Sequence, residues 1–259
     1  MIYMLLAVKT YKVNLQYRMA HLVHNLGSCI FCFVYMAIWT GILSGREEMS
    51  PYGLQELLFY LTSTQCLLWL TTFLSPGLQI HLWVRSGDVS MYLARPVHFY
   101  LYTISQEMGR ISYNFFYRSI PIYLILGFAV GFHTPDEPLT LLWYALSSLF
   151  AIIIGLNFFY IVGITSFWTT EVRWAMYLNQ SLILMLGGQM LPLEFYPEPF
   201  ASILINLPFA SILYIPSMIL LEKLSYDMLG LQLFWCVVLI AFNVTVTQFA
   251  RRRVEIQGG

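Results

Sequence analysis

Charged side chains are scarce in this chain of 259 residues. They make up 10% of the sequence, whereas Ala, Val, Ile, Leu, Met, Phe, Trp, Tyr and Cys together make up 59%. Soluble domains contain roughly 25% charged residues and about 45 to 50% apolar ones. The composition therefore excludes an ordinary soluble domain. The formal net charge of zero also excludes a general electrostatic attraction to nucleic acid.

Signatures of catalysis are few as well. No Gly-x-x-x-x-Gly-Lys-Ser/Thr phosphate loop occurs, so this chain cannot bind and split ATP by that route. The four cysteines lie in apolar segments, where reduced thiols are expected rather than disulfides. Cys29 and Cys32 supply only half of a structural zinc site, and His21 and His24 have no third ligand in view. We expect neither a metal nor a cofactor in this chain.

Long apolar runs take up most of the sequence. About six spans of roughly 20 residues fit into a chain of this length. No soluble domain boundary interrupts them, so we predict a single membrane domain over residues 1–259. The apolar runs cover residues 22–44, 54–75, 111–132, 139–165, 175–191, 200–221 and 228–249.

The charges between these runs indicate which side of the membrane each connection faces. Basic and acidic flanks alternate along the chain, as the positive-inside rule predicts for successive crossings. This alternation places both termini in the cytoplasm. The segments assigned to the outer side contain two basic residues, Arg46 and Lys223, and eight acidic ones: Glu47, Glu48, Asp136, Glu137, Glu194, Glu198, Glu222 and Asp227.

The run over residues 200–221 does not fit the alternation. Only one crossing fits between the acidic segment near Glu198 and the basic residues Arg251 to Arg253 near the C-terminus. Prolines interrupt this run and its approach, and proline removes a backbone donor and kinks helices. We therefore predict an all-α membrane protein with six transmembrane helices and an outer re-entrant helical hairpin over residues 187–222, packed against the bundle.

The first residues, 1–20, are too polar to cross a membrane. Lys9, Lys12 and Arg18 interrupt their apolar side chains, and no small-residue cleavage site follows, so we expect this segment to stay attached. A helix in the cytoplasmic interface, with tyrosine rings at headgroup depth, suits this pattern.

The longest gap between spans is the cytoplasmic connection over residues 76–110. Its Gly87-Asp88 pair and Arg95-Pro96 pair predict turns next to a short helix parallel to the membrane. Two interpretations stay open, a docking element for a cytoplasmic partner and an ordinary positively charged loop. Docking is favoured by exposed apolar anchors of the kind enriched at interfaces, here Trp83, Val84, Met91, Tyr92 and Leu93.

A second unusual segment begins at Gly187 and Gly188. Glycine allows close backbone approach and Pro192 ends the helix, so the fifth crossing should stop there and turn within the outer leaflet. The segment is either an outer gate or a structural kink.

Ionisable residues at membrane depth would mark the path of a charged substrate or of protons. Glu56, Glu107, Arg110 and Arg118 lie near the ends of the expected helices, where their side chains can reach the interface by snorkelling. No chain of buried acids is evident. Coupling to an ion gradient is therefore not supported, and energy would come from another subunit.

Several motifs recur together in one known family. They are Ser86-Gly87-Asp88 with Leu93, Arg95 and Pro96, in a G-D-x-x-x-x-L-x-R-P pattern, and the break from Gly187-Gly188 to Pro192. Leu207-Pro208-Phe209-Ala210, Tyr214-Ile215-Pro216 and the basic stretch before Gly258-Gly259 complete the set. Over nearly its whole length, the chain resembles the permease subunits of bacterial type-2 ABC exporters.

The resemblance implies a transmembrane subunit that moves an amphipathic or lipid-like substrate, drug or peptide out of the cytoplasm or the inner leaflet. Two permeases, identical or related, would share one pathway in the lipid of the bacterial cytoplasmic membrane. Each would dock on a separate P-loop ATPase that holds ATP and magnesium. The implied ATPase-coupling residues are Ser86, Gly87, Asp88, Leu93, Arg95 and Pro96. The implied outer-gate residues are Gly187, Gly188, Pro192, Pro208, Phe209, Tyr214 and Pro216.

Two other classes of function stay open at this stage. One is an intramembrane enzyme that uses Cys, His or Glu residues near the interfaces, among them His21, His24, Cys29 and Cys32. The other is a membrane assembly or scaffold protein that transports nothing. A stoichiometric ATPase partner would distinguish a permease from both.

Overall fold

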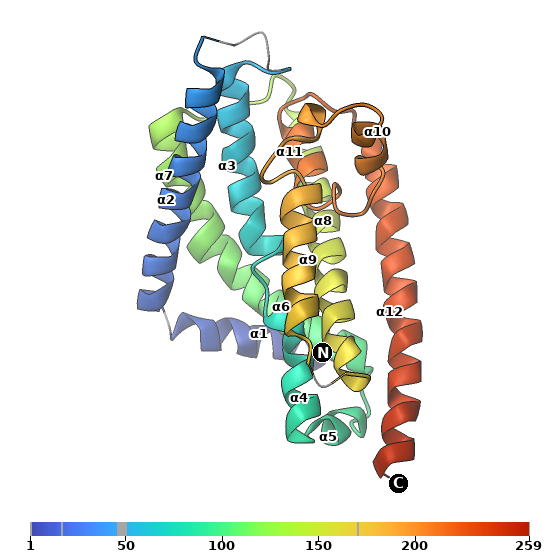
Figure 1. Ribbon diagram of the computed structural model, residues 1–259. Helices are drawn as coiled ribbons and strands as arrows, with labels where there is room; N and C mark the ends of the chain where they lie inside the picture. The colour runs from blue at the N-terminus through green and yellow to red at the C-terminus, as the bar shows by residue number, and fades with distance from the viewer. Residues whose placement is uncertain (1, 17, 46–50, 170, 259) are drawn as a thin grey trace.

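The computed structural model describes residues 2–16, 18–45, 51–169 and 171–258, and all regular structure in these ranges is helical (Figure 1). The predicted all-α class is confirmed. Arg46, Glu47 and Glu48 of the predicted outer charges lie outside the described residues. The helices are α1 (Ile2–Leu15), α2 (Arg18–Leu43), α3 (Leu54–Thr71), α4 (Ile80–Ser86), α5 (Val89–Leu93), α6 (Phe99–Asn114), α7 (Ile120–Val130), α8 (Leu139–Ile164), α9 (Arg173–Leu186), α10 (Phe200–Leu204), α11 (Tyr214–Leu220) and α12 (Met228–Gly258).

Four helical stretches in the described ranges are long and apolar enough to cross a membrane. They coincide with the first, second, fourth and last of the predicted crossings. The third predicted crossing falls within a helical path through α6 and α7, and the fifth coincides with the shorter α9. The count of six crossings stays a prediction. The four stretches are His21–Leu43, Leu54–Ser86, Leu139–Phe167 and Met228–Arg253.

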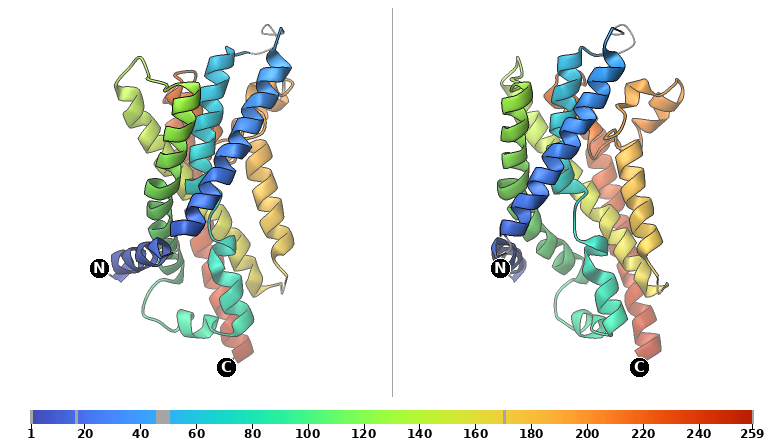
Figure 2. Two further views of the ribbon diagram at one scale, coloured as in Figure 1. Left: turned by 90° about the vertical axis from the view of Figure 1, so that its left-hand side faces the viewer. Right: turned by 60° about the vertical axis from the view of Figure 1, so that its left-hand side comes forward.

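The two ends of the bundle are built differently. At one end lie α10, α11 and the connection between α7 and α8, whereas α4, α5 and the C-terminal part of α12 project from the other (Figure 1). Helix α1 lies across the bundle instead of along it (Figure 2). Predicted basic and acidic connections therefore separate to opposite ends of the molecule.

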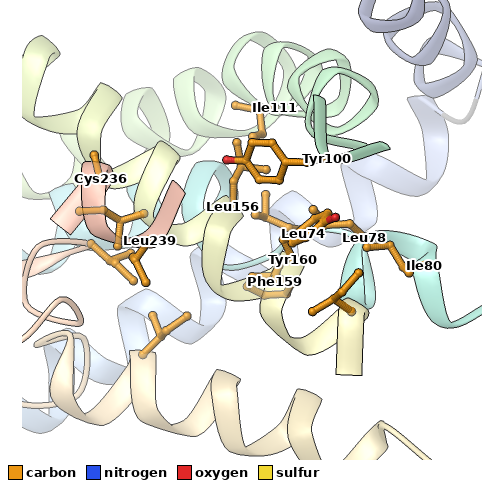
Figure 3. Packing of buried hydrophobic residues seen from close by; sticks show 14 of the residues in the cluster. Leu74, Leu78, Ile80, Tyr100, Ile111, Leu156, Phe159, Tyr160, Cys236 and Leu239 are labelled. Carbon is orange, nitrogen blue, oxygen red and sulfur yellow. The ribbon is translucent and has the colours of Figure 1, made fainter. Parts of the chain in front are cut away.

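Helix α8 forms the centre of the bundle and packs against α3, α11 and α12. Two of its glycines allow close backbone approach. A Cβ atom at Gly155 would lie 2.5 Å from the Thr71 carbonyl oxygen, and one at Gly163 would lie 2.1 Å from that of Gly77. Neither position has space for a larger residue. The surrounding buried cluster includes Leu74, Leu78, Tyr100, Leu156 and Tyr160 (Figure 3).

Buried hydrogen bonds join α8 to α6 and α12. Tyr100 OH donates to Asn157 Oδ1 at 3.0 Å, and Asn243 Nδ2 donates to the same oxygen at 2.8 Å. One turn further, the Tyr160 and Thr247 hydroxyl oxygens lie 2.6 Å apart. Because polar groups in an apolar interior need partners within the protein, these bonds favour a single alignment of α12 along α8.

The outward faces of α2 and α12 are apolar. Val23 on α2 is 70% exposed, and Val237 on α12 is 60% exposed. Exposure on this scale is unfavourable in water but suits contact with lipid. The exposed surface thus agrees with the composition, and both indicate a membrane protein.

A π-helical turn, η3 (Phe115–Ser119), joins α6 to α7. Its Arg118 is only 8% exposed, with the guanidinium carbon 4.0 Å from the centre of the Trp69 ring and a guanidinium nitrogen against His21 Nδ1. The expectation that Arg118 snorkels from a helix end is wrong, because α7 continues the helix beyond it. A cation–π contact and a ring nitrogen replace water around this charge.

Candidate functional site

A left-handed turn separates α3 from α4. Gly77, Leu78 and Gln79 have φ values of 49°, 46° and 64°, within the short segment η2 (Pro76–Gln79). Two of these residues are not glycine, so tertiary contacts must hold them in this costly conformation. The Gly77 carbonyl provides one such contact, against Gly163 of α8. The Pro-Gly pair predicts a turn, but no sequence pattern indicates left-handed Leu78 and Gln79.

Glu107 of α6 supports the same break in the chain. Its Oε1 accepts a hydrogen bond from Ser75 N at 2.8 Å and lies 3.6 Å from Arg110 Nε. Glu107 is 5% exposed, so its predicted snorkelling is also wrong. The carboxylate instead accepts from the backbone donor of Ser75, in the connection between α3 and η2.

Ser86, Gly87 and Asp88 form the exposed tip between α4 and α5. Gly87 has φ +81° with open space around it, a conformation that favours glycine. Ser86 Oγ donates to Asp88 Oδ2 at 2.7 Å, and Ser90 Oγ donates to the Gly87 carbonyl at 3.0 Å. These local bonds order the turn and leave its outer surface free to contact a partner.

Arg95 ties the end of α5 to α6. Its guanidinium carbon lies 4.8 Å from the Tyr92 ring centre and 5.6 Å from that of Tyr102, and Nη1 donates to Tyr102 OH at 3.3 Å. The Leu93 carbonyl accepts a hydrogen bond from Arg251 Nη2 of α12 at 3.3 Å. The predicted coupling residues therefore form two groups, with Ser86 to Asp88 at the tip and Leu93, Arg95 and Pro96 at its base.

The predicted apolar anchors of this segment mostly point inward. Trp83 and Tyr92 stack with ring centres 4.4 Å apart, and they pack partly buried against the core together with Val84 and Leu93. Only Met91 of the predicted set is exposed, at 57%. The aromatic content thus holds α4 and α5 to the bundle, since stacking between them buries both rings. Leu82 is also exposed, although the sequence did not predict it. In helices as short as α4 and α5, the order of apolar and polar residues does not define which face is exposed.

At the opposite end, Gly188 turns the chain after α9. Its φ is +85°, and Tyr60 OH of α3 donates to its carbonyl at 2.6 Å. A Cβ atom at Gly188 would lie 2.5 Å from that hydroxyl, and one at Gly187 would lie 3.2 Å from the Phe209 carbonyl. The predicted need for glycine is confirmed at both positions.

The next residue, Gln189, is not among the predicted gate residues. It is 3% exposed, and its Nε2 donates to Gln65 Oε1 of α3 at 3.2 Å. Gln65 Nε2 donates in turn to Ser28 Oγ of α2 at 2.7 Å. Three buried polar side chains therefore connect the segment after α9 to two other helices. Their polarity inside apolar runs is the sequence signal that could have identified them.

The other predicted gate residues pack inside the chain. Pro192, Pro208, Tyr214 and Pro216 are buried, and Phe209 stacks on Phe158 of α8 with ring centres 4.9 Å apart. All of α11 is buried, against α8 and α3. The predicted packing of this segment against the bundle is confirmed for these residues.

Glu222 closes the hairpin against the start of α8. Its carboxylate accepts hydrogen bonds from Thr140 Oγ1 at 2.6 Å and from Asp136 N and Glu137 N at 3.0 Å each. These donors lower the pKa of Glu222, Thr140 contributing most. A carboxylate beside a helix N-terminus is also favoured by the helix dipole. The sequence identified Glu222 only as an outer charge.

The alternative catalytic residues do not assemble. Cys29 and Cys32 are buried, unpaired and packed against α3, and His21 contacts Arg118. In the ranges that the structure describes, no three His, Cys, Asp or Glu side chains lie close enough to hold a metal ion.

Comparison with known proteins supports one family. No curated protein and no solved structure matches this chain. Residues 29–258, which include both ends described above, match the family whose description is ABC-2 family transporter protein. Permeases of that family generally work with ATPase partners. The chain belongs to the ABC-2 family of transporter proteins, and it is a membrane-embedded transport permease.

Proposed function

We propose that this chain is one of two membrane subunits of an ATP-driven exporter in a bacterial cytoplasmic membrane. A separate P-loop ATPase, with ATP and magnesium, would supply the energy, since this chain lacks a phosphate loop. The two permeases would be identical or related. The cargo would be amphipathic or lipid-like, a drug or a peptide, which suits an apolar pathway between subunits.

The proposed topology has six crossings, with both termini in the cytoplasm. The path from Phe99 to Val130 is helical throughout and exceeds the roughly 20 residues that a crossing needs. Helix α9 and the turn after it would form the fifth crossing. The segment over residues 187–222 would then enter and leave on the outer side, which α11 supports by being fully buried. Irregular backbone at membrane depth requires such cover.

The observation that carries the proposal is the exposed tip over Ser86 to Asp88. It projects from the same end as the basic C-terminal part of α12 (Figure 1). Its own hydrogen bonds order it, and Arg95 anchors its base on α6. An ordered projection on the positive end suits docking on a cytoplasmic partner, because a preorganised surface loses less entropy on binding.

The hairpin over residues 187–222 would form the outer gate. It is attached to α3 through Gly188 and Gln189 and to α8 through Glu222. Both helices connect it to the end that carries the tip. A rearrangement of α3 and α8 during ATP binding would therefore reach the hairpin directly.

A matched pair of variants tests the docking assignment. Asp88 and Asp227 each accept a hydrogen bond from a serine two residues earlier, at 2.7 and 2.9 Å, but they lie in turns at opposite ends. With the ATPase in proteoliposomes, Asp88→Ala should lower permease-stimulated ATP hydrolysis and transport about tenfold. Asp227→Ala should leave both unchanged.

Arg95→Ala should lower permease-stimulated ATP hydrolysis and transport in the same way, with normal membrane insertion. Insertion is measured by the yield of monodisperse protein after detergent extraction. Wild-type transport by both Asp88→Ala and Arg95→Ala would show that the docking assignment is wrong. An ATPase that fails to co-purify with the chain would count against transport altogether.

A further inference from the structure

A cavity of about 550 Å³ lies between α1, α6 and the left-handed turn η2. Helices α1 and α6 cross in direct backbone contact, and a Cβ atom at Gly109 would lie 2.1 Å from the Ala7 carbonyl oxygen. Beside this crossing both helices line the cavity, α1 with residues between Leu6 and Asn14 and α6 with residues between Tyr102 and Arg110. Figure 2 shows α1 lying across the bundle at this level.

The walls of the cavity are positively charged. Lys9 of α1, Arg95 and Arg110 line it, and Glu107 is the one carboxylate among the described lining residues. Three positive charges against one negative charge leave a net charge of plus two, with histidine neutral. Glu107 is already engaged by the backbone of Ser75. The excess charge therefore favours an anionic ligand.

Several buried donors in the wall have no partner within the described part of the chain. Arg110 Nε makes no hydrogen bond, since the nearest Glu107 oxygen is 3.6 Å away. Ser75, which is 1% exposed, has an unpaired Oγ, and His21 has an unpaired Nε2. Leaving buried polar groups without hydrogen-bond partners is unfavourable. A ligand with several acceptor oxygens would satisfy them together.

We propose that this cavity binds a phosphate group. Phosphate combines negative charge with several acceptor oxygens, which suits lysine and arginine donors. The faces of α1 that turn away from the cavity carry exposed apolar side chains, with Met4 74% and Leu5 58% exposed. Contact of these side chains with lipid would bring α1 to the membrane surface, where an anionic phospholipid could place its headgroup in the cavity. The site does not depend on the ATPase, and it connects α1 to Arg95 at the base of the tip.

Lys9 and Lys12 provide a matched test, because both lie on α1 but only Lys9 lines the cavity. The purified chain in neutral detergent is titrated with dioleoyl phosphatidic acid, dioleoyl phosphatidylcholine or inorganic phosphate, and bound molecules are counted by native mass spectrometry. Lys9→Gln should weaken binding of phosphatidic acid about fivefold, the contribution typical of one cation near a lipid phosphate. Arg110→Gln should weaken it at least as much.

Lys12→Gln should bind phosphatidic acid as the wild type does. Binding of inorganic phosphate with the same dependence on Lys9 would assign the site to free phosphate instead of a lipid. Equal losses for Lys9→Gln and Lys12→Gln would indicate general surface attraction and overturn the proposal. The proposal would also be overturned if phosphatidylcholine bound as tightly as phosphatidic acid, or if neither phosphatidic acid nor inorganic phosphate bound. None of these readouts uses ATP, so the test stands apart from that of the exporter function.

Discussion

The two ends of this permease contain the same local turn, which is exposed in both cases. Ser86 with Asp88 and Ser225 with Asp227 form equivalent serine–aspartate hydrogen bonds. The first turn lies at the exposed tip between α4 and α5. The second follows a hairpin whose last helix is buried along its whole length. The same local hydrogen bond therefore occurs in two exposed turns, and what differs is how the neighbouring helices are packed.

The attachment beneath the projection should be the most sensitive to substitution. In Gly163→Ala, the new Cβ would lie 2.1 Å from the Gly77 carbonyl oxygen, where backbone has little room to move. We expect a loss of about 3 kcal/mol in the free energy of unfolding. The midpoint of thermal unfolding in detergent measures it. Gly230→Ala in α12 is the control, because nothing lies within 4 Å of its Cβ, and it should not destabilise.

Alanine substitutions at Gly188 and Gly87 should lower the free energy of unfolding by different amounts at the two ends. Gly188→Ala combines a left-handed φ with a contact at 2.5 Å to Tyr60 OH, so it should lose about 2 to 3 kcal/mol of stability. Gly87→Ala has the left-handed φ but open space, and it should lose about 1 kcal/mol. Thermal unfolding of both variants tests the ranking. Equal losses would mean that the hairpin is no more tightly packed than the tip.

The smallest effect should be the pH dependence that Glu222 confers on the hairpin. Its pKa is lowered by hydrogen bonds, so its stabilisation is present above the ordinary carboxyl value of 4.5 and is lost as pH falls through the lowered pKa. Glu222→Gln should unfold at a lower temperature than wild type at pH 7, and the gap should shrink as pH falls below 4.5. A gap independent of pH would show that the charge is not responsible.

Local patterns in the sequence predicted much of this structure. Hydropathy located the long helices, and the glycine and proline pairs located the turns at Gly87 and Gly188, because both signals depend on neighbouring residues. The inward packing of Trp83 and Tyr92, the contact between Gly77 and Gly163 and the role of Glu222 were not predictable. Each depends on residues far apart in the chain, which only the tertiary fold brings together.

The π-helical turn η3 has a further consequence for the register of the chain. A π turn holds one residue more than an α turn, and one residue rotates everything after it by about 100°. The spacing of buried residues in α6 therefore does not continue in phase through Phe115–Ser119 into α7. Deleting one residue there would restore a regular helix but rotate α7 by about 100°, which would turn part of its packed face towards lipid. The extra residue is what allows one continuous helix to present two unrelated surfaces.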